Sequence, residues 1–375
     1  MVKDHIDMLA KVIGPRGSAT QGEKKAADYV AAKLSEWGYE VQVQPFRALT
    51  TFGWLYIVFY LWPLVAWLLG WWWFGALGAV LFFLELNTVA TLSRLLPTGQ
   101  SQNIIAKHRE GSGQQVVLVA HLDSSKAGLN FSPQMVPHFR TSFLAMVAAM
   151  ASAPVLLALG LALGGFWHFA ALIPCLYLLT ICGTLLHREL WNNYTRGAND
   201  NASGVAAVLA VAEKVKAKLP EGVALTILLT GCEESGTYGM VRFLEQQGGE
   251  YRQAWFVNLD NIGAGTLHYM SGEGMFPTFR STPEILMACQ AVAKARPDLD
   301  VRQGVYNLLS TDALPALQRG YKAISLLALD ENGLLPNWHW PTDTVDNIDE
   351  KTVTTAVEFC LELLEQIYRR HHRGE

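Results

Sequence analysis

The sequence predicts an α/β domain with a mostly parallel central sheet and helices on both faces, interrupted by two inserted hairpins of membrane-spanning helices. Two observations support this prediction. Four long runs of the chain contain almost no charged residue, and the remainder alternates short apolar runs, bounded by turn residues, with amphipathic segments. The first pattern is typical of helices in a bilayer, and the second is typical of a sheet covered by helices.

The composition agrees with a membrane protein. The chain has 375 residues, of which 51% are hydrophobic and only 17% are charged. Soluble proteins carry about 25% charged residues, so the apolar residues are expected to be concentrated in spans. The formal net charge of −4 predicts no basic surface, and we therefore expect no nucleic-acid partner.

Two pairs of apolar segments are each long enough to cross a bilayer. They cover residues 52–69 and 71–92 in the first pair and residues 143–164 and 166–186 in the second. A bilayer core of about 30 Å needs roughly 20 helical residues. Each pair is joined by almost no loop, and tryptophans stand at both turns, as expected at a membrane interface. We therefore predict four spans in two hairpins, at residues 52–96 and 138–190, and not four core helices of a soluble protein.

The positive charges predict an orientation for these spans. The turns of both hairpins carry no Lys or Arg, whereas arginines flank the opposite ends, namely Arg47, Arg94, Arg140, Arg188 and Arg196. The positive-inside rule places such ends in the cytoplasm. We expect an integral protein of the cell (inner) membrane, with the lipid bilayer as a partner and the polar domain in the cytoplasm. The sequence leaves the oligomeric state open.

Without the hairpins, the chain is expected to form one α/β domain from residues 1–51, 97–137 and 191–375. Six runs are typical of strands: residues 41–46, 103–107, 116–120, 224–230, 255–259 and 323–329. Helices are expected at residues 204–218, 283–295 and 351–369, and between a cap at Ser18 or Thr20 and a stop at Gly38. This alternation favours a doubly covered sheet.

Acidic residues and histidines follow the strands where they end. They are His121 and Asp123 after the first apolar strand, Glu233 and Glu234 after the second, Asp260 after the third, and His339 in the loop after the fourth, with Asp200 just before the helix that begins near Gly204. Ligands of open α/β sheets bind beyond the carboxyl ends of the strands. We therefore expect these side chains to meet at one edge.

Each of these motifs taken alone has an ordinary structural explanation, as a turn, a solvated loop or a helix cap. Their joint occurrence at strand ends favours a metal site. Imidazole and carboxylate groups suit zinc, and catalytic zinc sites keep a position open for water.

The motifs "HLD", "NDNASG", "EESG", "NLDNIG" and "HWPTDT" occur in an order that resembles the M28 family of co-catalytic zinc peptidases. The stretch "IGPRGSATQGEKKAADYVAAKL" also resembles the opening helix of that family. The resemblance covers nearly all of the polar chain and none of the hairpins. The chain departs from the family at residues 310–313, which are Ser-Thr-Asp-Ala where the family commonly has Ser-Asp-His.

The resemblance implies a zinc-exopeptidase-like fold and two Zn²⁺ ions, for which Co²⁺ or Mn²⁺ could substitute. One ion would be held by His121 and Asp260, and the other by Glu234 and His339. Asp200 would bridge the two ions. A bridging carboxylate stabilises two cations that would otherwise repel each other, and paired metals activate a shared water.

The resemblance also implies catalytic roles for Glu233 and Asp123. A metal-bridging hydroxide would attack the substrate carbonyl, with Glu233 as the general base and acid that passes a proton to the leaving amine. Asp123 would accept a hydrogen bond from His121 and orient its ring. We therefore expect a membrane-embedded metallopeptidase, specifically an aminopeptidase that removes N-terminal residues from peptides.

Other functions of this fold remain as alternatives. Carboxypeptidase-like hydrolases and single-zinc glutaminyl cyclases share it, although a cyclase needs only one metal and this chain has both His121 and Asp260. A non-catalytic membrane scaffold would be expected to lose ligands. A transporter would be expected to carry polar groups inside its spans.

Overall fold

The chain divides into two compact units, which we call the α/β unit and the helical unit. The computed structural model describes residues 2–109 and 111–373. The α/β unit comprises Met1–Thr50, Thr98–Ser125 and Tyr194–Glu375, and the helical unit comprises Thr51–Pro97 and Lys126–Asn193. Residues 126–137, which the sequence placed in the α/β domain, group with the helical unit.

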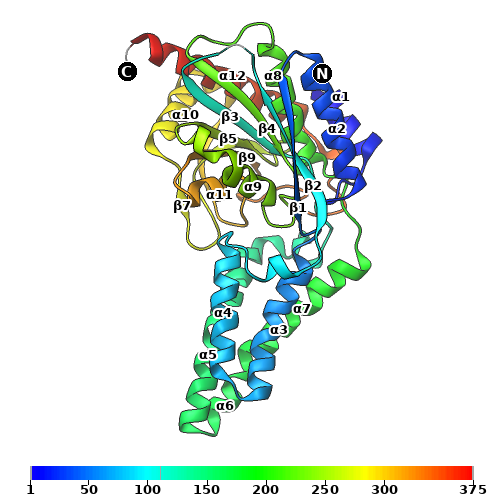
Figure 1. The fold of residues 1–375 in the computed structure, drawn as a ribbon, viewed down its shortest axis with the longest axis vertical. Helices are drawn as coiled ribbons and strands as arrows, with labels where there is room; N and C mark the ends of the chain where they lie inside the picture. The colour runs from blue at the N-terminus through cyan, green and yellow to red at the C-terminus, as the bar shows by residue number, and fades with distance from the viewer. Residues whose placement is uncertain (1, 110, 374–375) are drawn as a thin grey trace. The chain divides into compact units, whose positions relative to one another are not determined.

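A nine-stranded sheet forms the centre of the α/β unit (Figure 1). Its order is β1-β2-β4-β3-β5-β9-β6-β7, and β8 lies beside β6. The strands are β1 (Glu40–Ala48), β2 (Gly99–Lys107), β3 (Gln114–His121), β4 (Val223–Thr230), β5 (Trp255–Leu259), β6 (Thr266–Glu273), β7 (Phe279–Arg280), β8 (Arg302–Tyr306) and β9 (Lys322–Leu329). The six predicted strands all lie in this sheet, whereas β6, β7 and β8 were not predicted.

The prediction of a mostly parallel sheet is right only for the four central strands. β4 pairs parallel with β3, β3 with β5, and β5 with β9. Every residue of β5 is buried, as expected for a strand covered on both faces. β1, β2 and β4 pair antiparallel on one side, and β6 pairs antiparallel with β9 on the other. The sheet is therefore mixed. The sequence did not predict the antiparallel strands because hydrophobic patterns report burial and not strand direction.

Helices cover both faces of the sheet, and successive residues of β3 point to opposite layers. Val117 and Val119 pack with α9 (Tyr238–Gln247) and α11 (Ala313–Gln318), which lie on the near side of the strands in Figure 1. Leu118 and Ala120 belong to the larger core on the other face. The helices of that core are α1 (Val2–Asp7), which continues as a π-helix over Met8–Ile13, α2 (Gln21–Glu36), α8 (Gly204–Val215), α10 (Pro283–Ala295) and α12 (Glu350–Arg373).

The ends of α2 follow the predicted signals only in part. Thr20 is the N-cap residue, but its hydroxyl donates to the carbonyl oxygen of Gly17 at 2.6 Å and not to the helix. Gly38 follows the last turn with a φ of +88°, a conformation that glycine adopts at no steric cost. The chain therefore turns into β1 at the residue that the sequence predicted.

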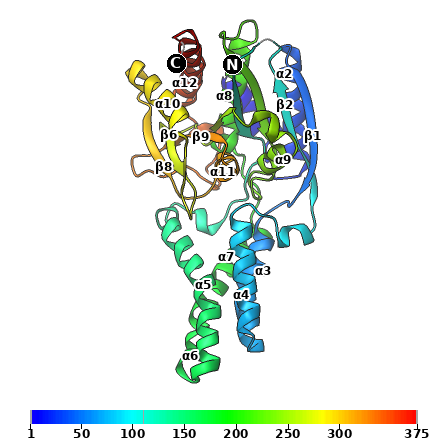
Figure 2. The same ribbon diagram turned by 60° about the vertical axis from the view of Figure 1, so that its left-hand side comes forward.

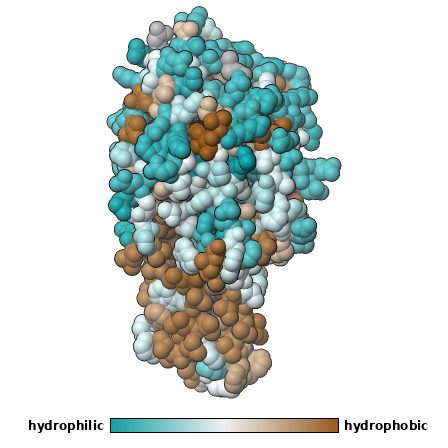
Figure 3. Space-filling view, turned by 90° about the vertical axis from the view of Figure 1, so that its right-hand side faces the viewer, coloured by the Kyte–Doolittle hydropathy of each residue, from teal (hydrophilic) through white to brown (hydrophobic). Residues whose placement is uncertain are grey.

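The helical unit contains five α-helices, α3 (Gly53–Leu69), α4 (Trp72–Leu86), α5 (Phe139–Leu163), α6 (Phe166–Ala170) and α7 (Leu172–Trp191). It also contains three short 3₁₀ helices, at Leu92–Leu95, Leu129–Phe131 and Val136–His138. α3 packs against α4, α5 and α7 (Figure 2). Large apolar side chains such as Leu68, Val155 and Ile173 are exposed, and the face of the unit seen in Figure 3 is mostly hydrophobic. Exposed apolar surface of this extent is uncommon on soluble monomeric proteins.

Among residues 2–109 and 111–373, the structure has two candidate membrane spans where the sequence predicted four. The helical stretches Val136–Leu163 and Phe166–Trp191 are long and apolar enough to cross a bilayer. α3 and α4 have 17 and 15 residues, which is short of the roughly 20 that a bilayer core of about 30 Å needs. The predicted second run, residues 71–92, is longer than the helix, which ends at Leu86. Beyond that point the chain folds back, and Glu85 accepts hydrogen bonds from the backbone N–H and the hydroxyl of Thr91 at 2.7 and 2.6 Å.

Candidate functional site

The predicted site residues lie at the carboxyl edge of the parallel strands. β3 ends at His121, β4 ends three residues before Glu233, and β5 ends one residue before Asp260. His339 lies in the loop after β9, and Asp200 lies just before α8. Parallel strands in register place their carboxyl ends together, which is why residues from distant parts of the sequence meet here.

Asp200 is at the centre of the cluster, and its two carboxylate oxygens face different histidines. Oδ1 lies 3.0 Å from Nε2 of His121, and Oδ2 lies 3.0 Å from Nε2 of His339. Each histidine faces one further carboxylate. Nε2 of His121 lies 3.4 Å from Oδ1 of Asp260, and Nε2 of His339 lies 3.0 Å from Oε2 of Glu234. The side chains therefore form two groups that share Asp200.

The chemistry of this cluster fits metal ions. The ligand atoms of His121, Asp200 and Glu234 lie within 4.8 Å of one another, and all five residues are buried. Within the described part of the chain, Oε1 of Glu234 is buried without a hydrogen-bond partner. A buried carboxylate oxygen that lacks a partner is costly unless a cation satisfies it. Three carboxylates and two imidazoles are thus suited to divalent zinc.

The carboxylates dominate the electrostatics of both histidines. Burial alone would lower the pKa of His121, but the neighbouring Asp260, Asp123 and Asp200 outweigh it and raise the pKa well above its usual value. Burial likewise lowers the pKa of His339, and Glu234 and Asp200 outweigh it and raise the pKa to about 9. The cluster therefore attracts positive charge strongly, whether as protons or as metal ions.

Asp123 lies beside His121, as predicted, but the hydrogen bonds of its carboxylate go to other groups. Its carboxylate accepts hydrogen bonds from the Ser18 hydroxyl at 2.6 Å and from the backbone N–H groups of Glu233 and Glu234 at 3.1 Å each. The distance from its Oδ1 to Nδ1 of His121 is 3.6 Å, too long for a hydrogen bond. The backbone carbonyl of Asp123 is instead the closer partner of that ring nitrogen, at 3.1 Å. The carboxylate thus holds the glutamate loop, and the main chain orients the imidazole.

Glu233 is half-buried next to this cluster. Burial raises the pKa of Glu233 well above its usual value, and the charges of Glu234, Asp312 and Asp260 raise it further against the opposing effect of His121. A carboxylate with a raised pKa binds a proton more readily near neutral pH. Its position and its proton affinity suit a general base.

Three functional candidates were not singled out from the sequence. Arg16 and Asp343 hydrogen-bond the chain around Asp200. Tyr306 is buried, and burial together with the carboxylates of Asp260 and Asp200 raises the pKa of its hydroxyl well above the usual value. Arg16 and Asp343 lie inside the quoted stretches "IGPRGS" and "HWPTDT", but no spacing rule marks them, and Tyr306 lies in no motif.

The departure from the Ser-Asp-His pattern falls at the start of α11. Ala313 is buried there, and Oδ2 of Asp312 accepts a hydrogen bond from the Thr230 hydroxyl at the end of β4. Thr311 donates to the buried carboxyl of Glu273. The segment is therefore bound to the sheet by its threonine and aspartate, and an alanine methyl stands at the position of the usual histidine.

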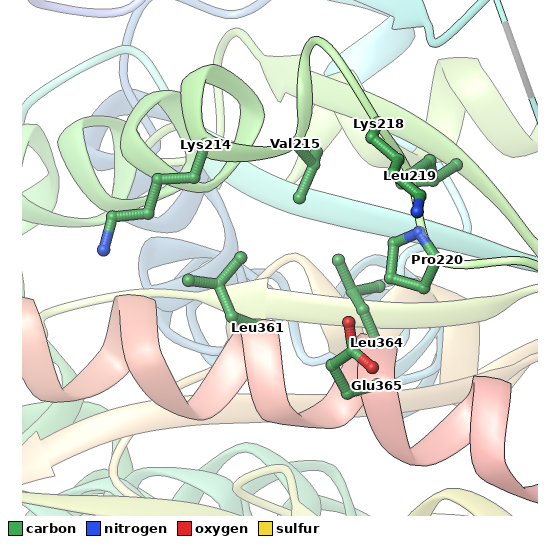
Figure 4. Close-up of a pocket in the computed structure, with 8 residues that line it drawn as sticks. All are labelled: Lys214, Val215, Lys218, Leu219, Pro220, Leu361, Leu364 and Glu365. Atoms are coloured by element: carbon green, nitrogen blue, oxygen red, sulfur yellow. The ribbon is translucent and has the colours of Figure 1, made fainter.

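A cavity of about 450 Å³ lies between the end of α8 and α12 (Figure 4), away from the acid and histidine cluster. Its lining residues are Lys214, Val215, Lys218, Leu219, Pro220, Leu361, Leu364 and Glu365. Residues 218–220 precede β4, whereas Glu233 follows it. An eight-residue strand spans about 25 Å, so this cavity lies at the opposite edge of the sheet from the cluster.

The chain matches one peptidase family model over part of its length and shares its fold with several solved structures. The model of peptidase family M28 matches residues 183–364. The comparison with curated proteins gives no match. A Zn-dependent exopeptidase from Parabacteroides distasonis is similar in structure, with a TM-score of 0.59 and 18% identity over 97% of this chain and 96% of that chain.

Two further solved structures resemble the chain to the same degree. A glutaminyl cyclase from Tannerella forsythia has a TM-score of 0.59 and 17% identity, covering 97% of this chain and 96% of that chain. A zinc aminopeptidase from Bacillus subtilis has a TM-score of 0.57 and 14% identity, covering 99% and 94%. The fold is therefore that of the zinc exopeptidases and glutaminyl cyclases. At these identities the likeness shows the fold alone.

The buried carboxyl of Glu273 predicts a pH-dependent stability. Burial raises the pKa of Glu273 from 4.5 to about 7, although the hydroxyls of Ser325 and Thr311 lower it. Because the folded pKa lies above the unfolded value, this group's contribution is fully present below about pH 4.5 and is lost as the pH rises toward 7. A Glu273→Gln variant stays neutral. Its melting temperature relative to the wild type should therefore rise between about pH 5 and about pH 8.

Thermal unfolding of metal-free protein in detergent, followed by tryptophan fluorescence, measures this difference. The protein is treated with a chelator beforehand, so that bound cations do not act on the nearby carboxylates. Parallel pH profiles of the two proteins would show that Glu273 is ionised in the folded state throughout this range.

Proposed function

We propose that the chain is a metallopeptidase of the M28 family that binds two zinc ions and removes N-terminal residues from peptides. The observation that carries this proposal is the position of Asp200. Its two oxygens are each 3.0 Å from a different histidine, and each histidine has its own further carboxylate. A shared carboxylate between two such groups suits a pair of cations.

The ligand sets follow from these distances. His121 and Asp260 would hold one ion, Glu234 and His339 would hold the other, and Asp200 would contribute an oxygen to each. When bound, two such ions lower the pKa of a water molecule and polarise a substrate carbonyl. Cobalt or manganese would satisfy the same nitrogen and oxygen donors.

Glu233 is the residue that we assign to proton transfer. Its raised pKa suits a group that takes a proton from the attacking water and returns it to the leaving amine. Asp123 fixes the backbone of Glu233 and Glu234 at 3.1 Å, which keeps the base and the neighbouring ligand in register. Burial and the nearby carboxylates keep the Tyr306 hydroxyl protonated at neutral pH, so it is available as a hydrogen-bond donor.

A glutaminyl cyclase is the second candidate. The cyclase from Tannerella forsythia is as similar in fold as the zinc exopeptidase from Parabacteroides distasonis, with a TM-score of 0.59 in both cases. The presence of both His121 and Asp260 beside Asp200 favours two ions and hence the peptidase. A carboxypeptidase, a scaffold and a transporter have no specific observation in their favour.

We also propose that the helical unit lies in a membrane and that the α/β unit faces the cytoplasm. Two stretches of the unit have the length and hydropathy of membrane spans, and the exposed side chains of its helices are largely apolar. Arg94 and Arg140 lie at the ends of the helices opposite the tryptophan-rich turns. This distribution supports a cytoplasmic location for those ends.

Peptide cleavage distinguishes the candidate reactions. Purified protein in detergent should release single residues from peptides with free N-termini and should leave blocked peptides intact. A Glu233→Gln variant should lower kcat by roughly 10²- to 10⁴-fold because it cannot accept the proton. Glu331→Gln, at an exposed loop residue, is the matched control. Cyclisation of N-terminal glutamine without cleavage would instead support the cyclase, and cleavage of blocked peptides would refute an aminopeptidase.

The metal content of the purified protein tests the two-ion site. We expect two divalent ions per chain, and about one after His121→Ala, because that change removes a ligand from only one group. His268→Ala is the control. Nδ1 of His268 donates to the carbonyl oxygen of Thr266 in β6 at 2.7 Å, and because His268 is not one of the five proposed ligands, its loss should leave the metal content unchanged. A wild-type content of one ion would favour the single-zinc alternative.

Protease protection tests the proposed orientation. A tag at the C-terminus should resist protease added to intact cells and should be cleaved in permeabilised cells. Digestion of the tag in intact cells would place the α/β unit outside. Extraction of the protein from membranes by salt or alkali without detergent would contradict the membrane location itself.

A further inference from the structure

The chain around Asp200 is bound on two sides by side chains outside the ligand set. We call residues 196–200 the Asp200 loop. The Arg16 guanidinium donates to the carbonyl oxygens of Arg196 and Gly197, each at 2.8 Å. The Asp343 carboxylate accepts from the backbone N–H groups of Asn199 at 2.6 Å and Asp200 at 3.2 Å. The carbonyl groups of the loop are thus bound by the Arg16 cation, and its N–H groups are bound by the Asp343 carboxylate.

The Arg16 side chain donates its hydrogen bonds to backbone carbonyl groups. Its side chain is 1% exposed. It also donates to the carbonyl oxygens of Leu122 and Leu9 at 2.9 Å and of Gly14 at 3.2 Å. Within residues 2–109 and 111–373, these five hydrogen bonds all end on backbone carbonyls. Burying a guanidinium is costly unless its donors are satisfied, and here the donors join the Asp200 loop to Leu122, the residue after His121.

Gly197 shows how closely the loop approaches Arg16. Its φ is +60°, and a Cβ at this position would lie 2.6 Å from Cβ of Ser124 and 2.8 Å from Nη2 of Arg16. Only glycine adopts this backbone conformation and this close approach without strain. The sequence around the loop is therefore adapted to contact with the guanidinium.

Asp343 joins the same loop to the second histidine. It is 1% exposed and follows His339 by four residues in the same connection after β9. Its two oxygens each accept from a different residue of the Asp200 loop. Arg16 therefore ties the loop to the segment of His121, and Asp343 ties it to the segment of His339.

We propose that Arg16 and Asp343 are positioning residues that hold the two oxygens of Asp200 against His121 and His339 and so set the affinity of the site for its ions. This inference rests on the proposed function, because it assigns a role toward the ions of that site. The hydrogen bonds described above for both side chains are to backbone groups. Their action is through the backbone of the Asp200 loop.

Conservative variants separate positioning from general stability. Arg16→Lys keeps the positive charge but loses the planar fork that reaches both Leu122 and the loop. Asp343→Asn keeps the shape but turns one acceptor into a donor that faces a backbone N–H group. Leu363→Ala, a fully buried core position of α12, is the control for a loss of thermal stability without a change at the loop.

Three measurements on the full chain in detergent test the proposal. Zinc affinity, by competition with a chromophoric chelator, should fall roughly 10- to 100-fold in Arg16→Lys and in Asp343→Asn. The absorption spectrum of the cobalt-substituted protein should shift in both variants. Hydrogen exchange of the metal-free protein should be faster at the amides of Asn199 and Asp200. Leu363→Ala should match the wild type in all three, although it melts at a lower temperature.

The double variant adds a further check. If both residues hold the same loop, its affinity should fall by less than the product of the two single losses. Wild-type affinity and an unchanged cobalt spectrum in both single variants would refute the positioning role while leaving the metal site intact. An equal loss in Leu363→Ala would show that the effect is general destabilisation and would also refute it. A wild-type protein that binds neither zinc nor cobalt would refute the proposed function itself.

Discussion

The negative charge collected at one edge of the sheet is the constraint on which the rest of the structure depends. Three carboxylates, those of Asp200, Glu234 and Asp260, meet two imidazoles, and each of the five residues is less than a tenth exposed. Burying carboxylates costs several kcal/mol each unless they are paired. Arg16 is a buried cation that interacts electrostatically with Asp200 and Glu234, but its hydrogen bonds are to backbone carbonyl groups. Under the proposed function, divalent ions shared through Asp200 would balance this charge and would use the ligand chemistry that the residues offer.

The sheet brings the carboxylates and histidines to one edge, and hydrogen bonds from other side chains to the loops hold these groups at their distances from one another. Asp123, after β3, binds the glutamate loop after β4. Arg16 and Asp343 bind the Asp200 loop, which precedes α8. Residues 126–193 of the helical unit are inserted between Asp123 and Asp200. Thr195 donates to the carbonyl of Ser125 at 2.8 Å, and the Ser124 hydroxyl donates to the carbonyl of Thr195 at 3.0 Å. The insertion of residues 126–193 therefore leaves the two flanking segments of the α/β unit hydrogen-bonded to each other.

The sequence predicts the positions of the ligands better than their environment. His121, Glu234 and Asp260 could be assigned to one edge because each follows an apolar strand, and parallel strands end together. The contact of Asp123 with the backbone of Glu233 and Glu234 could not be predicted, because it depends on the approach of two loops 110 residues apart. The same applies to Arg16, whose partners at Arg196 and Gly197 are 180 and 181 residues away. In the helical unit, hydropathy marks an apolar run but not the residue at which the helix ends, as Leu86 and Glu85 show.

X-ray diffraction near the zinc absorption edge tests the central claim most directly. Crystals of the purified protein should give two anomalous peaks, one on each side of Asp200. One peak should lie beside His121 and Asp260, and the other beside Glu234 and His339. A single peak, or a cluster whose carboxylates contact only protein groups, would contradict the account.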